Sequence, residues 1–185
     1  LANRLTPCLD DLLDDVQHCI PGMCISDPIR TVQSIIHQCK SLKQPGAIML
    51  CDFEKAFDRV DHDFMLQVLD RMAFPSEFIN WIQLLYTSST TSVRINNINS
   101  KALNLNSGVR QGCPISPLLF ACVVECMANL IRHDPSVKGI ISPLNKEIKL
   151  SQYADDTVLV LQDWTGFINC KKHIDIFCLA SGMKL

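Results

Sequence analysis

Two adjacent carboxylates, Asp155 and Asp156, occur in the segment YADD, residues 153–156, and side chains of this type can take part in catalysis. They lie between two apolar runs, where one buried carboxylate is costly and two neighbouring ones repel each other. A bound cation would offset both costs. Asp155 and Asp156 therefore indicate a cation site, for which an ordinary polar turn is the alternative.

A third carboxylate, Asp52, follows from the apolar run 47–53, which predicts a buried strand. If this strand lies beside the hairpin predicted over 148–161, then Asp52, Asp155 and Asp156 meet at one place. Three carboxylates and substrate phosphates can hold two hard cations, one to activate an attacking oxygen and one to stabilise a leaving phosphate. The pattern favours phosphoryl transfer, although a helix cap would also explain Asp52.

The loop within residues 107–120, SGVRQGCPISPLLF, contains two glycines and two prolines and leads into a predicted helix. Glycine lets the backbone come close to a flat or charged partner. Gln111 could hydrogen-bond the edge of a base or sugar, and Arg110 could contact a phosphate. The alternative is a rigid connector whose polar residues face water.

The remaining pattern predicts the elements that position these residues. Apolar spacing predicts a helix over 9–19 and further helices that begin near residues 26, 64, 76, 116 and 163. In the second helix, the predicted apolar face holds Ile29, Val32, Ile36 and Cys39. Alternation predicts that 93–95 pairs with 103–105 in another hairpin. We expect an α+β fold, an antiparallel sheet with helices packed on one face.

The overall composition is that of a globular domain. The chain has 185 residues, of which 48% are hydrophobic and 19% charged, and no apolar run is long enough to span a membrane. The net charge of −2 and the lack of a basic block disfavour a nucleic-acid partner, although a total does not show clustering. The start at Leu1 and the end at Leu185 suggest a piece of a longer protein.

Ten cysteines are scattered through mainly apolar stretches, which favours free thiols in a reducing compartment. One group could instead ligate zinc, although it contains no CxxC pair and its spacing matches no common zinc module. Packed thiols and surface histidines are the simpler interpretation. The residues of this group are His18, Cys19, Cys24, His37 and Cys39.

Four motifs, DFEKAFDRVDH, GVRQGCPISPLLF, YADDTVLVL and SGMKL, resemble in this order the reverse transcriptase domain of non-LTR retrotransposons, the long interspersed element type. The resemblance extends over essentially all of residues 1–185. It implies the palm and partial fingers of a right-hand polymerase, without the start of the fingers and without the thumb. The implied activity is that of an RNA-directed DNA polymerase, which adds deoxynucleotides to a primer 3′-hydroxyl by two-metal nucleotidyl transfer.

The resemblance also implies roles for individual residues. Asp52, Asp155 and Asp156 resemble the metal-binding aspartates, which would hold two Mg²⁺ ions, for which Mn²⁺ can substitute. Lys184 resembles a lysine proposed to assist the departure of pyrophosphate. Phe57 matches an aromatic steric gate that favours deoxynucleotides, and it could also be a core aromatic. The nucleotide- and template-binding residues implied are Phe53, Phe57, Arg110, Gln111, Gly112 and Tyr153.

The implied partners are an RNA template, a DNA primer and deoxynucleoside triphosphates, with no membrane. The expected location is intracellular and reducing, without a distinction between cytoplasm and nucleus, and the sequence does not determine the oligomeric state. Two departures, His18-Cys19-Ile20 after Gln17 and Met23 where an arginine is usual, favour an alternative. This alternative is an inactive relic or a binding module of the same fold. A metal-dependent nuclease could use the same carboxylates, but no water-activating base accompanies them.

Overall fold

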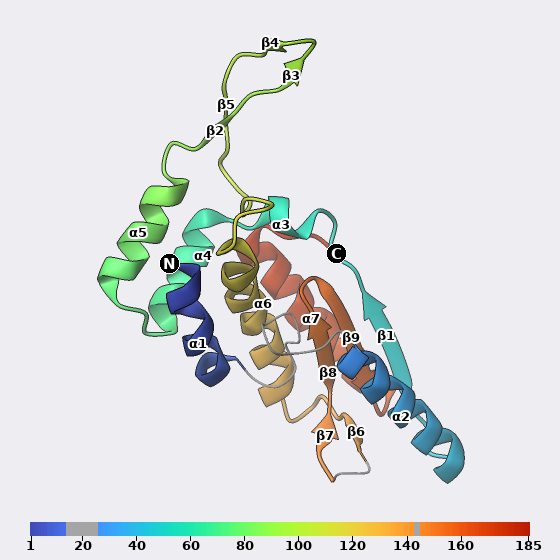
Figure 1. Ribbon diagram of the computed structural model, residues 1–185. Coiled ribbons are helices and arrows are strands. Elements are labelled where there is room, and N and C mark those ends of the chain that lie inside the picture. Colours follow the sequence, from blue (N-terminus) through green and yellow to red (C-terminus); the bar gives the residue numbers. More distant parts are fainter. Residues whose placement is uncertain (14–25, 143–144) are drawn as a thin grey trace.

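The computed structural model describes residues 1–13, 26–142 and 145–185 (Figure 1). The helices are α1 (Ala2–Leu12), α2 (Ser26–Leu42), α3 (Ala56–Arg59), α4 (His62–Arg71), α5 (Ser76–Tyr86), α6 (Ser116–His133) and α7 (Trp164–Ser181). The strands are β1 (Ala47–Cys51), β2 (Thr90–Thr91), β3 (Arg94–Ile95), β4 (Ile98–Asn99), β5 (Leu103–Asn104), β6 (Ile140–Ile141), β7 (Glu147–Ile148), β8 (Leu150–Tyr153) and β9 (Asp156–Leu161).

A three-stranded antiparallel sheet of order β1-β9-β8 forms the frame of the molecule. The predicted hairpin is confirmed, since Tyr153 of β8 pairs with Asp156 of β9. The predicted strand at 47–53 is also confirmed, although β1 ends at Cys51, which pairs with Thr157 of β9. The expected meeting of the three aspartates depended on the strand at 47–53 lying beside the hairpin at 148–161. The pairing of β1 with β9 fulfils this condition.

The two faces of this sheet are covered by different helices. Leu159 and Leu161 of β9 belong to the main core with residues of α6 and α7. Val160, which points to the opposite face because side chains alternate along a strand, packs with Ile35 of α2 and with Ile140. The predicted α+β class is confirmed, and α2 adds cover on a face that we expected to lack helices.

The helix α2 buries a different side from the one that apolar spacing predicted. Its start at Ser26 agrees with the predicted helix start. However, Ile29 is 54% exposed and Ile36 is 36% exposed, whereas Pro28 and Ile35 are buried. The predicted face was therefore wrong for Ile29 and Ile36, whereas Cys39 packs against the cluster of Ile35 and Val160. Periodicity alone offered several apolar stripes, and the position of Val160 in the sheet selected the stripe that contains Ile35.

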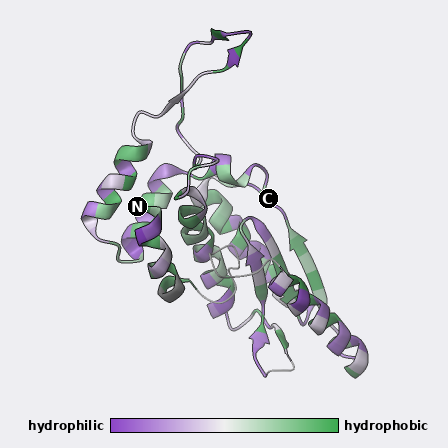
Figure 2. Cartoon of the chain, in the orientation of Figure 1, coloured by the Kyte–Doolittle hydropathy of each residue, from purple (hydrophilic) through white to green (hydrophobic). Residues whose placement is uncertain are grey.

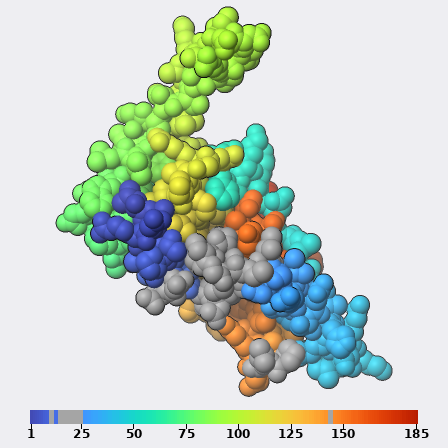
Figure 3. All heavy atoms as spheres, viewed as in Figure 1, coloured from blue at the N-terminus to red at the C-terminus, as the bar shows by residue number. Residues whose placement is uncertain are grey.

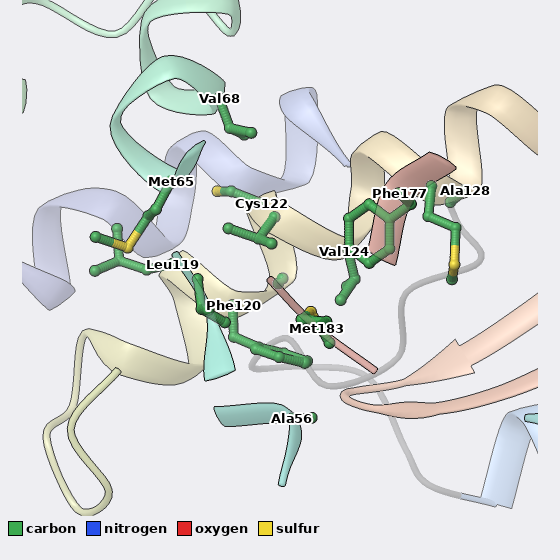
Figure 4. Packing of buried hydrophobic residues seen from close by; sticks show 14 of the residues in the cluster. Ala56, Met65, Val68, Leu119, Phe120, Cys122, Val124, Ala128, Phe177 and Met183 are labelled. Atoms are coloured by element: carbon green, nitrogen blue, oxygen red, sulfur yellow. The ribbon is translucent and has the colours of Figure 1, made fainter. Parts of the chain in front are cut away.

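Helix α6 runs through the main core and is buried along most of its length (Figure 4), and Figure 2 shows the hydropathy of its residues. Its start at Ser116 confirms the prediction, and it ends at His133. The buried side chains of Leu119 and Phe120 lie among residues from α4, α7 and the C-terminal segment (Figure 4). Burial of this much apolar surface is the main stabilising contribution to the fold.

Aspartate side chains cap the starts of two helices, α4 and α7, and a glycine ends α7. The Asp163 carboxylate accepts a hydrogen bond of 2.8 Å from the backbone N–H of Gly166 and begins α7. Gly182 ends this helix with a φ of 73°, a conformation in which glycine is least strained. The Asp61 carboxylate similarly accepts 2.8 Å from the N–H of Phe64 at the start of α4.

Strands β2 to β5 form a thin projection, residues 90–104, which we call the arm (Figures 1 and 3). The predicted pairing of 93–95 with 103–105 was wrong. Arg94–Ile95 pairs with Ile98–Asn99, and Thr90–Thr91 pairs with Leu103–Asn104. The reason is the two-residue turn at Asn96 and Asn97, whose φ values of 49° and 64° suit a tight hairpin.

Several expectations fall on the N-terminal part. Helix α1 begins at Ala2, earlier than the helix predicted over 9–19. Three of the candidate zinc ligands, His18, Cys19 and Cys24, lie outside the described residues. The eight cysteines that the structure describes are free thiols. No helix in the described ranges is both long and apolar enough to cross a membrane.

Candidate active site

The antiparallel pairing of β1 with β9 brings the candidate carboxylates to the same edge of the sheet. Because Cys51 pairs with Thr157, the next residues outward, Asp52 and Asp156, lie at the same end of the two strands. Asp155 occupies the turn between β8 and β9, beside Ala154, whose φ is 54°. Asp52 and Asp156 are exposed, and Asp155 is half-buried.

The charges of the three carboxylates act on one another. Partial burial raises the pKa of Asp155, and the negative charges of Asp156 and Asp52 raise it further. A hydrogen bond with its own backbone opposes this shift. Asp52 and Asp156 therefore lie near enough to Asp155 for their charges to act on it.

The carboxylates do not form a complete metal centre by themselves. In the part of the chain that the structure describes, no three Asp, Glu, His or Cys side chains are arranged to hold a metal ion. Their chemistry nevertheless fits Mg²⁺, which takes oxygen ligands and is usually bound by one or two carboxylates together with substrate phosphates. Asp52, Asp155 and Asp156 therefore lie at the same edge of the sheet, as expected from the sequence, but they do not form a closed cluster of metal ligands.

Lys184 lies against the segment that follows Asp52. The backbone N–H of Glu54 donates to the carbonyl oxygen of Lys184 at 2.8 Å, and the Lys184 Nζ lies 3.2 Å from Glu54 Oε2. Arg59 binds the same carboxylate oxygen at 3.0 Å. Lys184 and, to a smaller extent, Arg59 hold the pKa of Glu54 below its ordinary value. Sequence reasoning missed Glu54, although its place two residues after Asp52 was a signal.

The loop before α6 is fixed against the segment around α3. The backbone N–H groups of Gly108 and Val109 donate to the carbonyl oxygens of Val60 and Phe57 at 2.8 and 2.7 Å. Gly108 has a φ of 90°, and a Cβ at this position would lie 2.7 Å from the carbonyl oxygen of Asp58. Only glycine fits this close approach without displacing backbone.

These backbone hydrogen bonds between the loop and the α3 segment place Gln111 beside Asp58. The Gln111 Nε2 donates to Asp58 Oδ1 at 3.1 Å, which leaves the amide oxygen as an acceptor for another group. Gly112 follows with a φ of 80° and open space around its Cα. Asp58 was missed by sequence reasoning, although it belongs to the same motif, DFEKAFD, as Asp52.

Arg110 makes contacts within the chain. Its Nη2 donates at 2.8 Å to the carbonyl oxygen of Leu85 and at 2.8 Å to Ser89 Oγ. The guanidinium also lies over the ring of Tyr86, 5.9 Å from its centroid. Arg110 therefore ties the loop to the end of α5, and a phosphate would have to compete with these contacts.

The candidate aromatic residues lie in different environments. The Phe57 ring stacks on Phe120 with centroids 4.3 Å apart and is half-buried, so it is fixed by the core and still reaches the surface. Phe53 is 3% exposed and packs edge-on against Phe177. Its side chain lies in the core, and the nucleotide contact expected of Phe53 stays a prediction. Tyr153 is half-buried at the end of β8.

A cavity of about 280 Å³ lies elsewhere, between α1 and the start of α5. Its lining includes Leu5, Phe74, Phe78 and Trp81 and none of the candidate site residues. The chemistry-bearing side chains therefore lie on an open edge of the sheet and not in this cavity.

Comparison with known proteins agrees with this arrangement. The profile of the family "Reverse transcriptase (RNA-dependent DNA polymerase)" matches residues 1–185. An uncharacterised 149 kDa protein of transposon TX1 from Xenopus laevis is 30% identical over 100% of this chain and 14% of its own length. The Pol polyprotein of the type-1 retrotransposable element R2 from Nasonia vitripennis is 32% identical over 100% of this chain and 18% of its own length.

Two solved structures share the fold. Telomerase from Candida tropicalis superimposes with a TM-score of 0.62 at 12% identity, covering 98% of this chain and 37% of that chain. Telomerase from Candida albicans gives a TM-score of 0.64 at 11% identity, covering 98% and 31%. Together with the family match over the full length, these findings show that the chain belongs to the reverse transcriptase family and is a reverse transcriptase domain of the non-LTR retrotransposon type.

Proposed function

We propose that this chain carries the polymerase site of an RNA-directed DNA polymerase, which adds deoxynucleotides to the 3′-hydroxyl of a DNA primer on an RNA template. The observation that supports it most is the edge that Asp52, Asp155 and Asp156 share, at the end of β1 and in and beside the turn between β8 and β9. The chain spans 14% and 18% of the two relatives described above, so the activity of such a longer protein belongs to this proposal.

The three aspartates are the proposed ligands of two Mg²⁺ ions, for which Mn²⁺ can substitute. When bound, such ions activate the primer hydroxyl and stabilise the charge on the leaving pyrophosphate. The chain's own contribution is to hold Asp52 and Asp156 on paired strands and Asp155 in the turn between strands. A rigid frame of this kind keeps the ligand oxygens near their working positions before substrate arrives.

The proposed nucleotide contacts lie around this edge. Phe57, held by Phe120, is the proposed gate that crowds a ribose 2′-hydroxyl. Gln111, oriented by Asp58, offers its amide oxygen to the nucleotide or template. Gly112 leaves space for a close approach of the substrate.

Three further residues have weaker proposed roles. Lys184, next to Glu54, is the proposed donor to pyrophosphate. Tyr153 remains a proposed template or nucleotide contact at the end of β8. A phosphate contact of Arg110 remains a proposal that requires the release of Ser89.

Primer extension on an RNA template with deoxynucleotides and Mg²⁺ or Mn²⁺ tests the proposed function. Asp156→Asn should abolish extension because it removes a ligand charge with almost no change in shape. Asp70→Asn, an exposed carboxylate on α4, is the matched control and should extend normally. Equal extension by the wild-type chain and Asp156→Asn would exclude the proposed site.

A second candidate, a binding module of the same fold without catalysis, is favoured by the lack of a complete three-ligand cluster in the described residues. Divalent-ion binding separates the two. Calorimetric titration with Mn²⁺ should show binding that Asp156→Asn weakens if the site is functional. A chain that neither binds Mn²⁺ nor extends a primer would contradict the proposed catalytic function and leave an inactive relic or a binding module.

A further inference from the structure

The arm, residues 90–104, is built differently from the rest of the chain. Its side chains are exposed throughout, including Ile95 and Ile98 at its tip, and it projects from the body (Figures 1 and 3). Its strands contribute none of the buried residues of either hydrophobic cluster among the described residues. Packing among the described residues therefore does not explain its sequence, and a contact outside these residues can.

The charge on this part of the chain is of one sign. No Asp or Glu occurs between Glu77 and Glu125, a stretch that contains the basic residues Arg94, Lys101 and Arg110. The whole chain, in contrast, has 19 Asp and Glu against 17 Lys and Arg. The net negative charge is therefore carried elsewhere, and the arm is a local cationic surface, which is the electrostatic feature that a polyanion recognises.

The arm also carries an unusual supply of amides. Five asparagines occur in or next to it, Asn96, Asn97, Asn99, Asn104 and Asn106. Each amide offers donors and an acceptor and carries no charge, so it can bond to sugars, phosphates and base edges without repelling them.

The tip combines these properties in a small space. Asn96 and Asn97 form the turn, which sets Ile95 directly opposite Ile98. Arg94 Nη2 donates to Asn97 Oδ1 at 3.2 Å. Basic and amide side chains beside an aliphatic pair are what β-ribbon and minor-groove proteins use to contact nucleic acid, the aliphatic groups lying against bases.

The base of the arm is tied to the candidate active site. The backbone N–H of Leu105 donates to the carbonyl oxygen of Ser89 at 2.8 Å, and Ser89 Oγ accepts from Arg110. Arg110 directly precedes Gln111, the proposed substrate contact. The segment from the tip of the arm to Gln111 thus contains no acidic residue and ends beside the candidate active site.

We infer that the arm is a polynucleotide-binding surface, in which Arg94 and Lys101 contact phosphates and Ile95 and Ile98 contact the bases. The inference rests on the proposed function in one respect, since the strand that it holds is taken to be the one that enters the site. The shared chemistry is a sugar–phosphate backbone, which an RNA or a DNA strand can supply.

Fluorescence anisotropy with a labelled single-stranded RNA, titrated at several salt concentrations, tests this inference. In the double variant Arg94→Ala, Lys101→Ala, affinity should fall on the order of tenfold at 0.1 M salt, and the slope of log K against log salt should become shallower by about 1.4, roughly 0.7 for each lost phosphate contact. A DNA strand of the same sequence shows which source is preferred. The control Lys171→Ala, Lys172→Ala removes the same charge from α7 and should leave the slope unchanged.

A second variant, Ile95→Ser, Ile98→Ser, should weaken binding severalfold without changing the salt slope, because it removes no charge. An arm variant that binds RNA as the wild type does, with the same slope, overturns the inference. So does a changed self-association in sedimentation with unchanged RNA affinity, which would make the arm a protein contact. Circular dichroism checks that both variants are folded.

A failure of the proposed catalytic function can be distinguished from a failure of the inference about the arm. Asp156→Asn should lose extension and keep the affinity and salt slope of the wild type. A chain without extension activity whose arm variants still lose RNA binding would therefore retain this inference and lose the proposed function.

Discussion

Two hairpins of this molecule have similar tight turns but differ in burial: the strands of one are buried and those of the other are exposed. The β8–β9 hairpin turns at Ala154 and Asp155, and the tip of the arm turns at Asn96 and Asn97. Ala154 in the first turn, and both Asn96 and Asn97 in the second, have a positive φ. Leu159 in the first hairpin is 0% exposed, whereas Ile98 in the second is 75% exposed.

The difference lies in what the flanking strands pack against. β9 is held between β1 and β8 and against α6 and α7, so its turn presents two carboxylates from a rigid support. The arm has no comparable support among the described residues, and the side chains at its turn are exposed. Chemistry that requires fixed oxygens fits the first hairpin, and adaptable binding fits the second.

The largest expected effect separates the two hairpins by activity. Asp155→Asn should lower single-turnover extension at least about a hundredfold, the usual loss when one preorganised electrostatic contact to a transition state is removed. Arg94→Ala with Lys101→Ala should raise the KM for template and leave kcat within about twofold, since these residues supply only binding. An equal loss of kcat in both variants would contradict this division.

Stability should separate the hairpins next. Leu159→Ala removes a fully buried side chain from the core and should lower the free energy of unfolding by about 2–5 kcal/mol. Ile98→Ala in the arm should change it by less than about 0.5 kcal/mol, because the side chain is exposed. Urea unfolding of the two variants measures both values. Similar losses would show that the arm is packed in solution.

A matched pair of glycines tests the loop that links the two regions. Gly108→Ala and Gly112→Ala both place a side chain at positive φ, a strain of about 1–3 kcal/mol. Gly108→Ala should cost more, because its Cβ would also meet the backbone of Asp58. Denaturant unfolding measures the free energy of unfolding of both variants. Equal losses would mean that the backbone at Asp58 moves away from the new side chain at little cost.

The smallest expected effect is a pH dependence of stability at the carboxylate edge. The pKa of Asp155 is raised in the folded chain, so folding favours its protonated form. Stability should therefore fall as pH rises from the unfolded pKa through the folded one. Asp155→Asn should be slightly more stable than the wild type at neutral pH and equal to it in acid. Thermal unfolding at both pH values checks this, and a less stable variant at neutral pH would reverse the sign.

Much of the local structure could be predicted from the sequence, because its causes lie within a few residues. The Asp163 cap, the glycine stop at Gly182 and the YADD turn follow from side-chain and φ preferences of single residues. The candidate aspartates were found in the same way, since two adjacent carboxylates between apolar runs are costly without a partner. Their place on one edge was predicted only under the condition that two strands pair.

Tertiary structure alone decided which of several local possibilities was used. Ile35 and not Ile29 became the buried residue of α2 because Val160 of the sheet lies against it. Phe53 entered the core because Phe177 of α7 packs against it. The contact of Gln111 with Asp58 joins residues far apart in the chain, which no local pattern encodes. Periodicity and turn preferences are short-range, whereas packing depends on which distant surfaces meet, and only the folded chain determines that.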